Sequence, residues 1–190
     1  MASTIYVDKL DPQSGTALEI GTSGDTITIP SGVTITNSGT SSGFGMSDLS
    51  PYFSVRQTGT VNVTDNTDTK VAWDSELVDT DNAFASDKFT VPSGKAGKYF
   101  LYTMGLGSGS ANSYLNVYYL NIYKNGSRIA MSENDLRGNA GRKLTCCVNT
   151  IQDLSAGDYI EVYVKVDINA GTAYFNGDDY QAMFGGFKIG

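Results

Sequence analysis

Short segments with strand character recur along residues 52–190, roughly every 10 residues, and this spacing constrains the fold more than any other feature. The segments are Tyr52 to Arg56, Thr69 to Trp73, Lys88 to Val91, Lys98 to Leu106, Tyr114 to Tyr123, Arg128 to Met131, Arg142 to Ile151, Asp158 to Val166, Thr172 to Phe175 and Tyr180 to Ile189. The composition agrees, with 22 Gly, 12 Tyr and 17% charged residues. Short strands joined by tight turns predict an all-β antiparallel sandwich or barrel.

Two segments give the strongest local predictions. Asn125-Gly126 suits a two-residue type I′ turn, whose two central residues need positive φ, and it predicts a hairpin between the flanking strands. The run Tyr159 to Asp167 alternates strictly, with Ile160, Val162, Val164 and Val166 on one face and tyrosines and charges on the other. The apolar face of this strand is expected to lie in the core.

The first 45 residues carry a thinner apolar pattern, in short alternating stretches separated by Gly, Pro and Ser. Its apolar members are Ile5, Val7, Leu10, Leu18, Ile20, Ile27, Ile29, Val33 and Ile35. One such stripe cannot bury enough area within one chain to offset the entropy of ordering, so the segment is expected to pack with copies of itself or with a partner. We predict a β-structured stalk over 1–45, a linker over 46–51 and a head over 52–190.

The head resembles the C1q/TNF-like jelly roll, most closely the versions carried on bacteriophage fibres. The resemblance rests on Trp73-Asp74, Phe84, Phe89-Thr90-Val91-Pro92, Gly97-Lys98-Tyr99, Tyr123-Lys124-Asn125-Gly126, Leu154 to Asp158 and Phe184-Gly185-Gly186-Phe187. Leu101 and Thr103 stand where C1q-like domains usually have alternating aromatic residues, and the loop between Phe89 and Gly97 is longer than usual. The stalk sequence from Gly24 to Ile35, with its alternating Thr and Ile, is also similar to the sequences of short β-structured phage shafts.

This resemblance implies a tight homotrimer with aromatic side chains around its threefold axis. The candidate axis residues are Tyr114, Tyr118, Tyr119, Tyr163, Phe184 and Phe187. Each of them, taken singly, is equally typical of the core or the ordinary surface of a β-sandwich.

The residue inventory argues against an enzyme. There is no histidine, which removes the usual general base and the His-containing nucleophile pairs and zinc sites. Asp74, Glu76, Asp79 and Asp81 lie close together in the sequence, but acids in such a turn-rich stretch are typical of a solvated loop. We therefore predict no catalytic residues and no cofactor.

Calcium is the alternative use of these acids and of Asp178-Asp179, because Ca²⁺ prefers carboxylate and carbonyl oxygens. Their spacing matches no EF-hand, so a turn-forming role is favoured over a metal site. The adjacent Cys146 and Cys147 would point to opposite faces of a strand, and we expect both to be reduced.

The net charge of −7, with no basic run, argues against nucleic acid as a partner. The N-terminal residues lack the pattern of a secretion signal and no long apolar run predicts membrane insertion, so we expect assembly in the host cytoplasm and residence in the virion. The predicted function is a trimeric, non-enzymatic phage fibre or knob that anchors to other virion proteins through its stalk and attaches to a host-surface glycan or protein. Candidate contact loops are Ser108 to Ser113, Glu133 to Gly141 and Asn169 to Asp179. An architectural capsid or tail component without a receptor, or a soluble C1q-like lectin, would fit the same residues.

Overall fold

The computed structural model describes residues 17, 18, 20–34, 36, 38, 39 and 49–189. The chain divides into two units, Met1–Gly45 and Met46–Gly190, which we describe separately. No helix among the described residues has the length and apolar character needed to span a bilayer.

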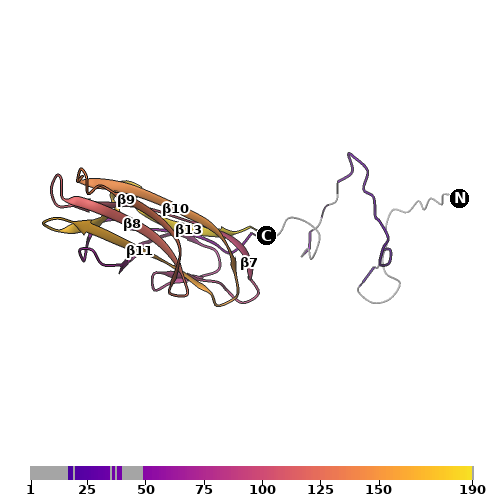
Figure 1. Cartoon of the computed structure of the whole chain (residues 1–190). Helices are drawn as coiled ribbons and strands as arrows, with labels where there is room; N and C mark the ends of the chain where they lie inside the picture. Colours follow the sequence, from indigo (N-terminus) through magenta and orange to yellow (C-terminus); the bar gives the residue numbers. More distant parts are fainter. Residues whose placement is uncertain (1–16, 19, 35, 37, 40–48, 190) are drawn as a thin grey trace. The chain divides into compact units, whose positions relative to one another are not determined.

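The second unit is a sandwich of two antiparallel sheets (Figure 1). Its strands are β1 (Tyr52–Arg56), β2 (Thr60–Val63), β3 (Thr69–Lys70), β4 (Ser75–Asp79), β5 (Phe84–Ala85), β6 (Lys88–Thr90), β7 (Gly97–Gly109), β8 (Leu115–Lys124), β9 (Ser127–Asp135), β10 (Lys143–Leu154), β11 (Tyr159–Ile168), β12 (Ala173–Asn176) and β13 (Met183–Lys188). One short 3₁₀ turn, Asp178–Tyr180, precedes β13. The predicted all-β, two-sheet antiparallel fold is confirmed.

We call the two layers sheet A and sheet B. Sheet A has the order β2-β12-β7-β13-β1-β4, and β10 pairs along the other edge of β7. Sheet B has the order β5-β6-β11-β8-β9, and β3 also pairs with β11. The first and last strands of the head, β1 and β13, are therefore neighbours in sheet A, and the long strand β7 carries most of that sheet.

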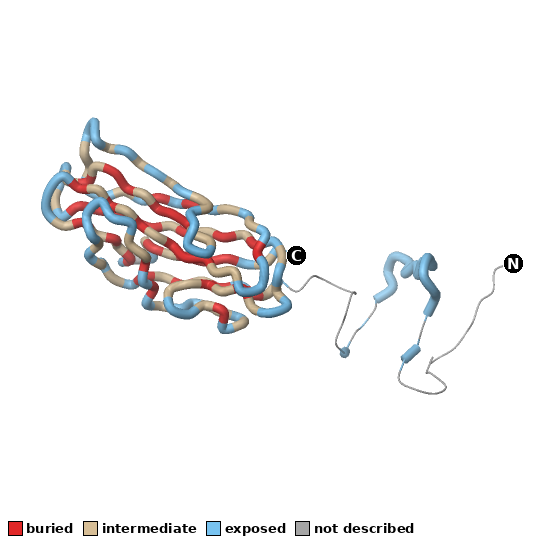
Figure 2. Tube along the Cα trace, turned by 60° about the horizontal axis from the view of Figure 1, so that its bottom comes forward, coloured by how far each residue is buried: buried red, intermediate tan, exposed pale blue. Residues whose placement is uncertain are grey.

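The core lies between the sheets and is built from alternate residues of the long strands (Figure 2). Phe53 of β1 stacks on Phe89 of β6 with ring centroids 4.4 Å apart, and Phe184 of β13 meets it edge-on at 4.9 Å. The predicted inward face of β11, from Ile160 to Val166, is fully buried. The alternation in the sequence therefore placed this strand correctly.

The predicted hairpin at Asn125-Gly126 joins β8 and β9, and its two central residues have φ of 50° and 77°. The predicted strand Thr69 to Trp73 shortens to β3, while β2, β4 and β5 form where no strand was predicted. All three are short edge strands, each paired with a single neighbour. Segments of two to five residues give a weak signal on their own, even where they alternate as β2 does.

The described residues of the N-terminal unit hold turns in the single chain. Its described residues form no strand, and they contain two turns, in which Asp25 N–H donates to the Thr22 carbonyl at 3.0 Å and Val33 N–H to the Pro30 carbonyl at 3.2 Å. The apolar residues Leu18, Ile20, Ile27, Ile29 and Val33 are all exposed. A strand needs a neighbour for its backbone N–H and C=O groups, and the sequence predicts that copies of the segment supply it, so the β-structured stalk stays a prediction. Ile5, Val7, Leu10 and Ile35 lie outside the described residues.

Candidate functional site

The outer face of sheet A is apolar at its centre, because β7 has large side chains on both of its faces. Tyr99, Leu101 and Thr103 point into the core and are buried. Alternation then places Phe100, Tyr102 and Met104 on the outer face, where a half-exposed strand would ordinarily carry polar residues. A strand that is apolar on both faces is typical of one covered on both sides.

Neighbouring strands extend this apolar centre across the sheet. Their registers align Ile151 of β10, Phe100 of β7, Phe187 of β13 and Tyr52 of β1 in one row. The rings of Phe100 and Phe187 lie 5.4 Å apart. Ile151 is 60% exposed in the single chain, Tyr52 46% and Phe187 41%, so the row forms an uncovered apolar band. We call this band, together with Tyr102, Met104 and Met183, the sheet A face.

A glycine keeps the sheet A face flat. Gly185 of β13 lies beside Tyr102 of β7, and a Cβ at Gly185 would overlap the Tyr102 hydroxyl. The missing side chain allows the Tyr102 ring to lie across β13 toward β1, where its hydroxyl donates to Ser54 Oγ at 3.4 Å. A flat aromatic surface of this kind is suited to packing against another protein surface.

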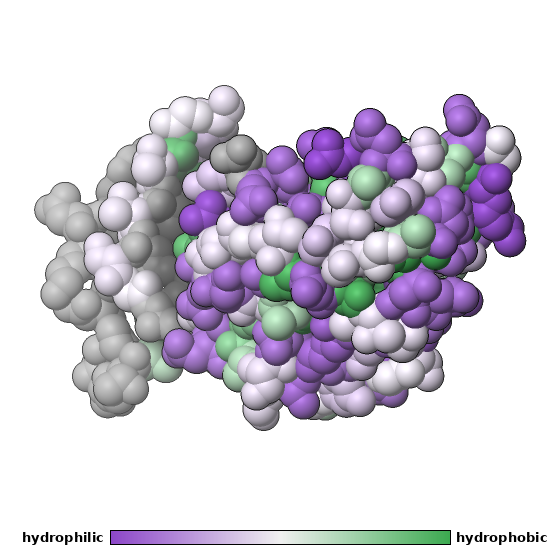
Figure 3. Space-filling model, turned by 90° about the vertical axis from the view of Figure 1, so that its left-hand side faces the viewer, coloured by the Kyte–Doolittle hydropathy of each residue, from purple (hydrophilic) through white to green (hydrophobic). Residues whose placement is uncertain are grey.

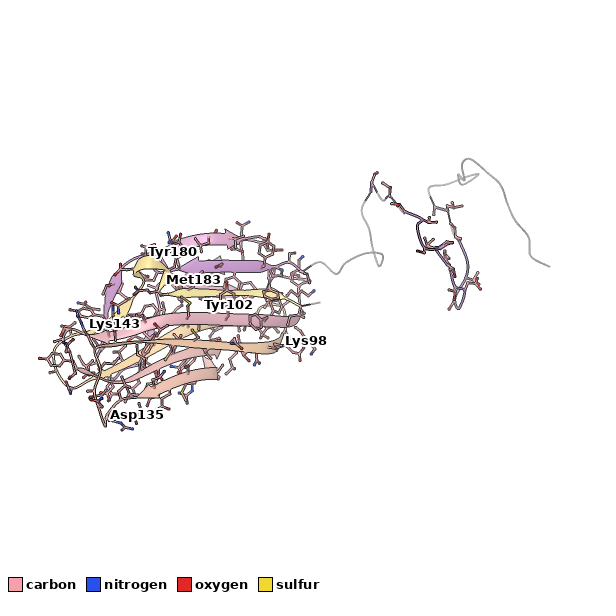
Figure 4. The ribbon with its side chains drawn as sticks, turned by 90° about the horizontal axis from the view of Figure 1, so that it is seen from above. Lys98, Tyr102, Asp135, Lys143, Tyr180 and Met183 are labelled. Atoms are coloured by element: carbon pink, nitrogen blue, oxygen red, sulfur yellow. The ribbon has the colours of Figure 1, made fainter. Side chains whose placement is uncertain are left out.

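Charged residues lie around the sheet A face rather than in it. Figure 4 views the sheet face on and shows Tyr102 and Met183 near the middle, with Lys98 and Lys143 toward opposite ends. Lys98 pairs with Asp153 at 2.7 Å, and the Arg56 guanidinium lies 4.3 Å from the centre of the Tyr180 ring. An apolar centre with a charged rim is the usual anatomy of a protein interface.

The structure separates the six predicted axis residues. Phe187 lies on the sheet A face, but Tyr118 and Phe184 are fully buried in the core of the single chain. Burial raises the pKa of the Tyr118 hydroxyl well above its ordinary value. Their placement at a trimer axis is corrected: neither side chain has surface to offer a neighbouring chain. Tyr119 and Tyr163 lie on the outer face of sheet B, and Tyr114 lies in a loop at one end of the sandwich.

Most residues of the sheet A face were not predicted from the sequence. Phe100, Tyr102, Met104, Ile151 and Met183 were assigned no role. The signal was present in the segment from Gly97 to Met104, which is apolar in both alternating sets. A strand buried on one side only would alternate, as β11 does.

The three predicted contact loops come together at one end of the sandwich. Ser110 N–H donates to the Thr172 carbonyl at 3.0 Å, Leu115 N–H to Gly141 at 2.9 Å and Asn169 N–H to Tyr114 at 2.9 Å. These bonds join the loops after β7, β9 and β11. The loops lie at the end of the head opposite its C-terminus. Figure 3 views the loop end and shows a mostly polar surface with apolar residues in its middle.

Three of the acidic residues considered as calcium ligands accept hydrogen bonds from the protein. Asp74 accepts hydrogen bonds from Thr58 N–H at 2.8 Å and Thr58 Oγ at 2.7 Å, and Asp79 accepts from Phe84 N–H at 2.8 Å. Asp178 accepts from Thr60 Oγ at 3.0 Å. Within the part of the chain that the structure describes, no three such residues are grouped as a metal site would require. Asp79 thus acts within a turn, the role the sequence favoured, whereas Asp74 and Asp178 each join segments that are far apart in the sequence.

The two cysteines are free thiols on opposite faces of β10. Cys146 points into the core, where burial raises the pKa of its thiol. Cys147 is exposed on the outer face of sheet A, beside Met104. The predicted opposite orientation is confirmed.

Comparison with solved structures identifies the architecture. The globular domain of zebrafish complement 1qA aligns with a TM-score of 0.51 and 18% sequence identity, over 74% of this chain and 98% of the zebrafish domain. The head has the fold of a C1q globular domain. No family model matches the chain, and no curated protein matches its sequence. The C1q-like part of the predicted resemblance is therefore confirmed at the level of fold.

Proposed function

We propose that this chain forms a trimeric, non-enzymatic binding head, held together by the sheet A faces of three copies. The proposal rests on one observation: the apolar row of Ile151, Phe100, Phe187 and Tyr52 is exposed on the surface of the folded single chain. A monomer rarely leaves a contiguous aromatic band of this kind open to water. C1q-like domains generally form trimers, and the alignment with the zebrafish domain supports that assembly here.

We propose further that the trimer is the attachment head of a bacterial-virus fibre. The sequence pattern of the stalk from Gly24 to Ile35, which is similar to that of phage shafts, supports this role. So do the exposed apolar residues of the described stalk, since a second and third copy of the segment would cover them. The stalk would anchor the head to other virion proteins, and the loop cluster around Tyr114 would face a host-surface glycan or protein.

Attachment through three copies needs only weak individual sites. Linking three sites on one rigid head raises the effective concentration of the second and third contacts, so the trimer binds a cell far better than a single head. No chemical step is required, in keeping with the lack of histidine and the use of the acids in turns. Avidity is therefore the proposed mechanism.

The test is retention of the fluorescently labelled chain on a panel of bacterial cells, with the Ile151→Glu variant as the monomeric control. We expect the native chain to be retained on at least one strain about a hundredfold better than the variant, because avidity requires linked sites. Equal retention of both would overturn the avidity mechanism. Retention on no strain would overturn the attachment role in favour of an architectural one.

A further inference from the structure

The outer face of sheet B carries a second aromatic surface, away from the sheet A face. It consists of Tyr119 and Tyr123 of β8 and Tyr163 of β11, all half-buried. The rings of Tyr123 and Tyr163 lie 4.5 Å apart and are inclined by 41°. We call these three residues the tyrosine platform.

A buried amide lies beneath the tyrosine platform. Asn121 lies between Tyr119 and Tyr123 on the same, outer face of β8, two residues from each. Its strand neighbours are Tyr163 on one side and Met131 on the other. Asn121 is 0% exposed, and its Oδ1 has no hydrogen-bond partner. Its Nδ2 donates to the Tyr163 carbonyl over a long 3.5 Å. Turning the amide over would set its oxygen against that carbonyl oxygen, so the acceptor is the group left unpaired.

A buried, unpaired acceptor is unfavourable for folding, and native proteins carry few of them. An apolar residue of similar size would fill the same space beneath the tyrosines without that cost. The position thus keeps an acceptor that the folded chain does not use. A hydrogen-bond donor of a bound ligand would satisfy it once the side chains that cover Asn121 move aside.

Charges of both signs lie around the tyrosine platform, and some of them have partners. Lys70 Nζ lies 2.8 Å from Glu161, and Lys165 Nζ lies 5.6 Å from the centre of the Tyr119 ring. A hydrogen bond to Glu133 raises the pKa of the Tyr119 hydroxyl. Asp68 and Arg128 act on Tyr123 with opposite signs as well, so no single sign of charge surrounds the platform and the surface favours an uncharged ligand.

We propose that the tyrosine platform binds the pyranose ring of a neutral saccharide, with Asn121 Oδ1 accepting a hydrogen bond from one of its hydroxyl groups. The apolar C–H face of a pyranose packs on an aromatic ring. Its hydroxyl groups are hydrogen-bond donors, and one of them can donate to Asn121 Oδ1. A proline-rich peptide could also pack on the rings, but proline has no N–H and would leave Asn121 unpaired. The inference goes beyond the loop contacts of the proposed function, because it adds a saccharide site on sheet B to the proposed binding head. It rests on that binding role but not on the trimer.

The experiment is saturation-transfer NMR on the full chain with three separate probes: methyl α-mannopyranoside, methyl β-galactopyranoside and N-acetylglucosamine. We expect at least one to bind with a dissociation constant of about 1 mM, as suits a shallow surface. A proline-rich peptide is the comparison probe. Failure of all three sugars, or binding of the peptide in their place, would overturn the proposal without touching the proposed trimer or its retention on cells.

Two variants separate a binding role from a structural one. Asn121→Leu removes the acceptor, and we expect saccharide binding to fall about tenfold, while the melting temperature stays level or rises. Tyr163→Ala should also lose binding. Tyr174→Ala, on the outer face of sheet A, is the matched control and should bind like the native chain. Unchanged saccharide binding by Asn121→Leu would overturn the role assigned to Asn121.

Discussion

The outer faces of the two sheets differ although the sheets share one core. Sheet A presents Phe100, Phe187 and Ile151 in an uncharged band, with Lys98 and Asp153 at its rim. On sheet B, tyrosines alternate with paired charges such as Lys70 and Glu161. The first face is suited to contact with another protein surface, and the second can remain in water. In this molecule, the number of apolar faces on a strand indicates how many of its sides are covered.

The largest effect is expected from breaking the sheet A face. Ile151→Glu places a charge in its apolar row, and burying an unpaired charge between chains is strongly unfavourable. Ile151 is exposed in the single chain, so the head itself should still fold. Sedimentation should show native chains at three times 20.3 kDa and the variant at 20.3 kDa.

The matched control for this variant is Met131→Glu, on the outer face of sheet B, where the native residue is 42% exposed. It should sediment like the native chain. A trimer that is lost in Met131→Glu and kept in Ile151→Glu would reverse the assignment of the two faces.

A smaller effect should distinguish two adjacent tyrosines of β8. Tyr118→Ala would leave a cavity against Gly105 and Gly107, whose missing side chains make room for the Tyr118 ring, and should lower the free energy of unfolding by about 3–5 kcal/mol. Tyr119→Ala, on the outer face of sheet B, should lower it by less than about 1 kcal/mol. Urea unfolding of both variants in the Ile151→Glu background measures this without the trimer. Equal losses would show that Tyr118 is not a core residue.

The smallest effect concerns the polar contacts at one end of sheet B. Asp158 accepts hydrogen bonds from Asn125 Nδ2 at 2.7 Å and Ser155 N–H at 2.8 Å, and its carboxylate lies 2.8 Å from Lys124 Nζ. The Lys124 contact, then those from Asn125 and Ser155, lowers the pKa of Asp158 to about 2. The stabilisation is thus complete above the ordinary pKa of about 4 and is lost as the pH falls toward 2.

Asp158→Asn should therefore destabilise the head by about 1 kcal/mol at neutral pH, with a difference from the native chain that shrinks between pH 4 and pH 2. Thermal unfolding across this pH range, again in the Ile151→Glu background, is the measurement. A difference that stays constant down to pH 2 would contradict the assigned role of the Asp158 carboxylate.

The sequence predicted features that local chemistry decides. The Asn125-Gly126 turn and the buried face of β11 followed from positive φ and from strict alternation. Which of Tyr118 and Tyr119 faces the core did not follow from the sequence, because two adjacent tyrosines fit either orientation of a strand. The inward direction of Tyr118 depends on Gly105 and Gly107, which lie against its ring although they belong to another strand. Residue order along β8 alone does not show this contact.

The sheet A face was predictable in part and was missed for a similar reason. Tyrosines on β8 and β11 drew attention as aromatic residues, whereas the face depends on how β7, β10, β13 and β1 line up. Strand order joins segments from both ends of the head, and residue spacing alone does not give it. The predicted strands of the stalk need neighbouring chains, so they stay a prediction about the assembled protein.

The central claim, that copies of the chain cover the sheet A face, is tested most directly by the reactivity of Cys147. This exposed thiol lies on the outer face of sheet A, while Cys146 beside it is 2% exposed and serves as an unreactive internal control. The rate of its reaction with a thiol reagent should be at least about tenfold slower in the native chain than in Ile151→Glu, because reactivity follows access to the thiolate. Equal rates in the two proteins would contradict the account.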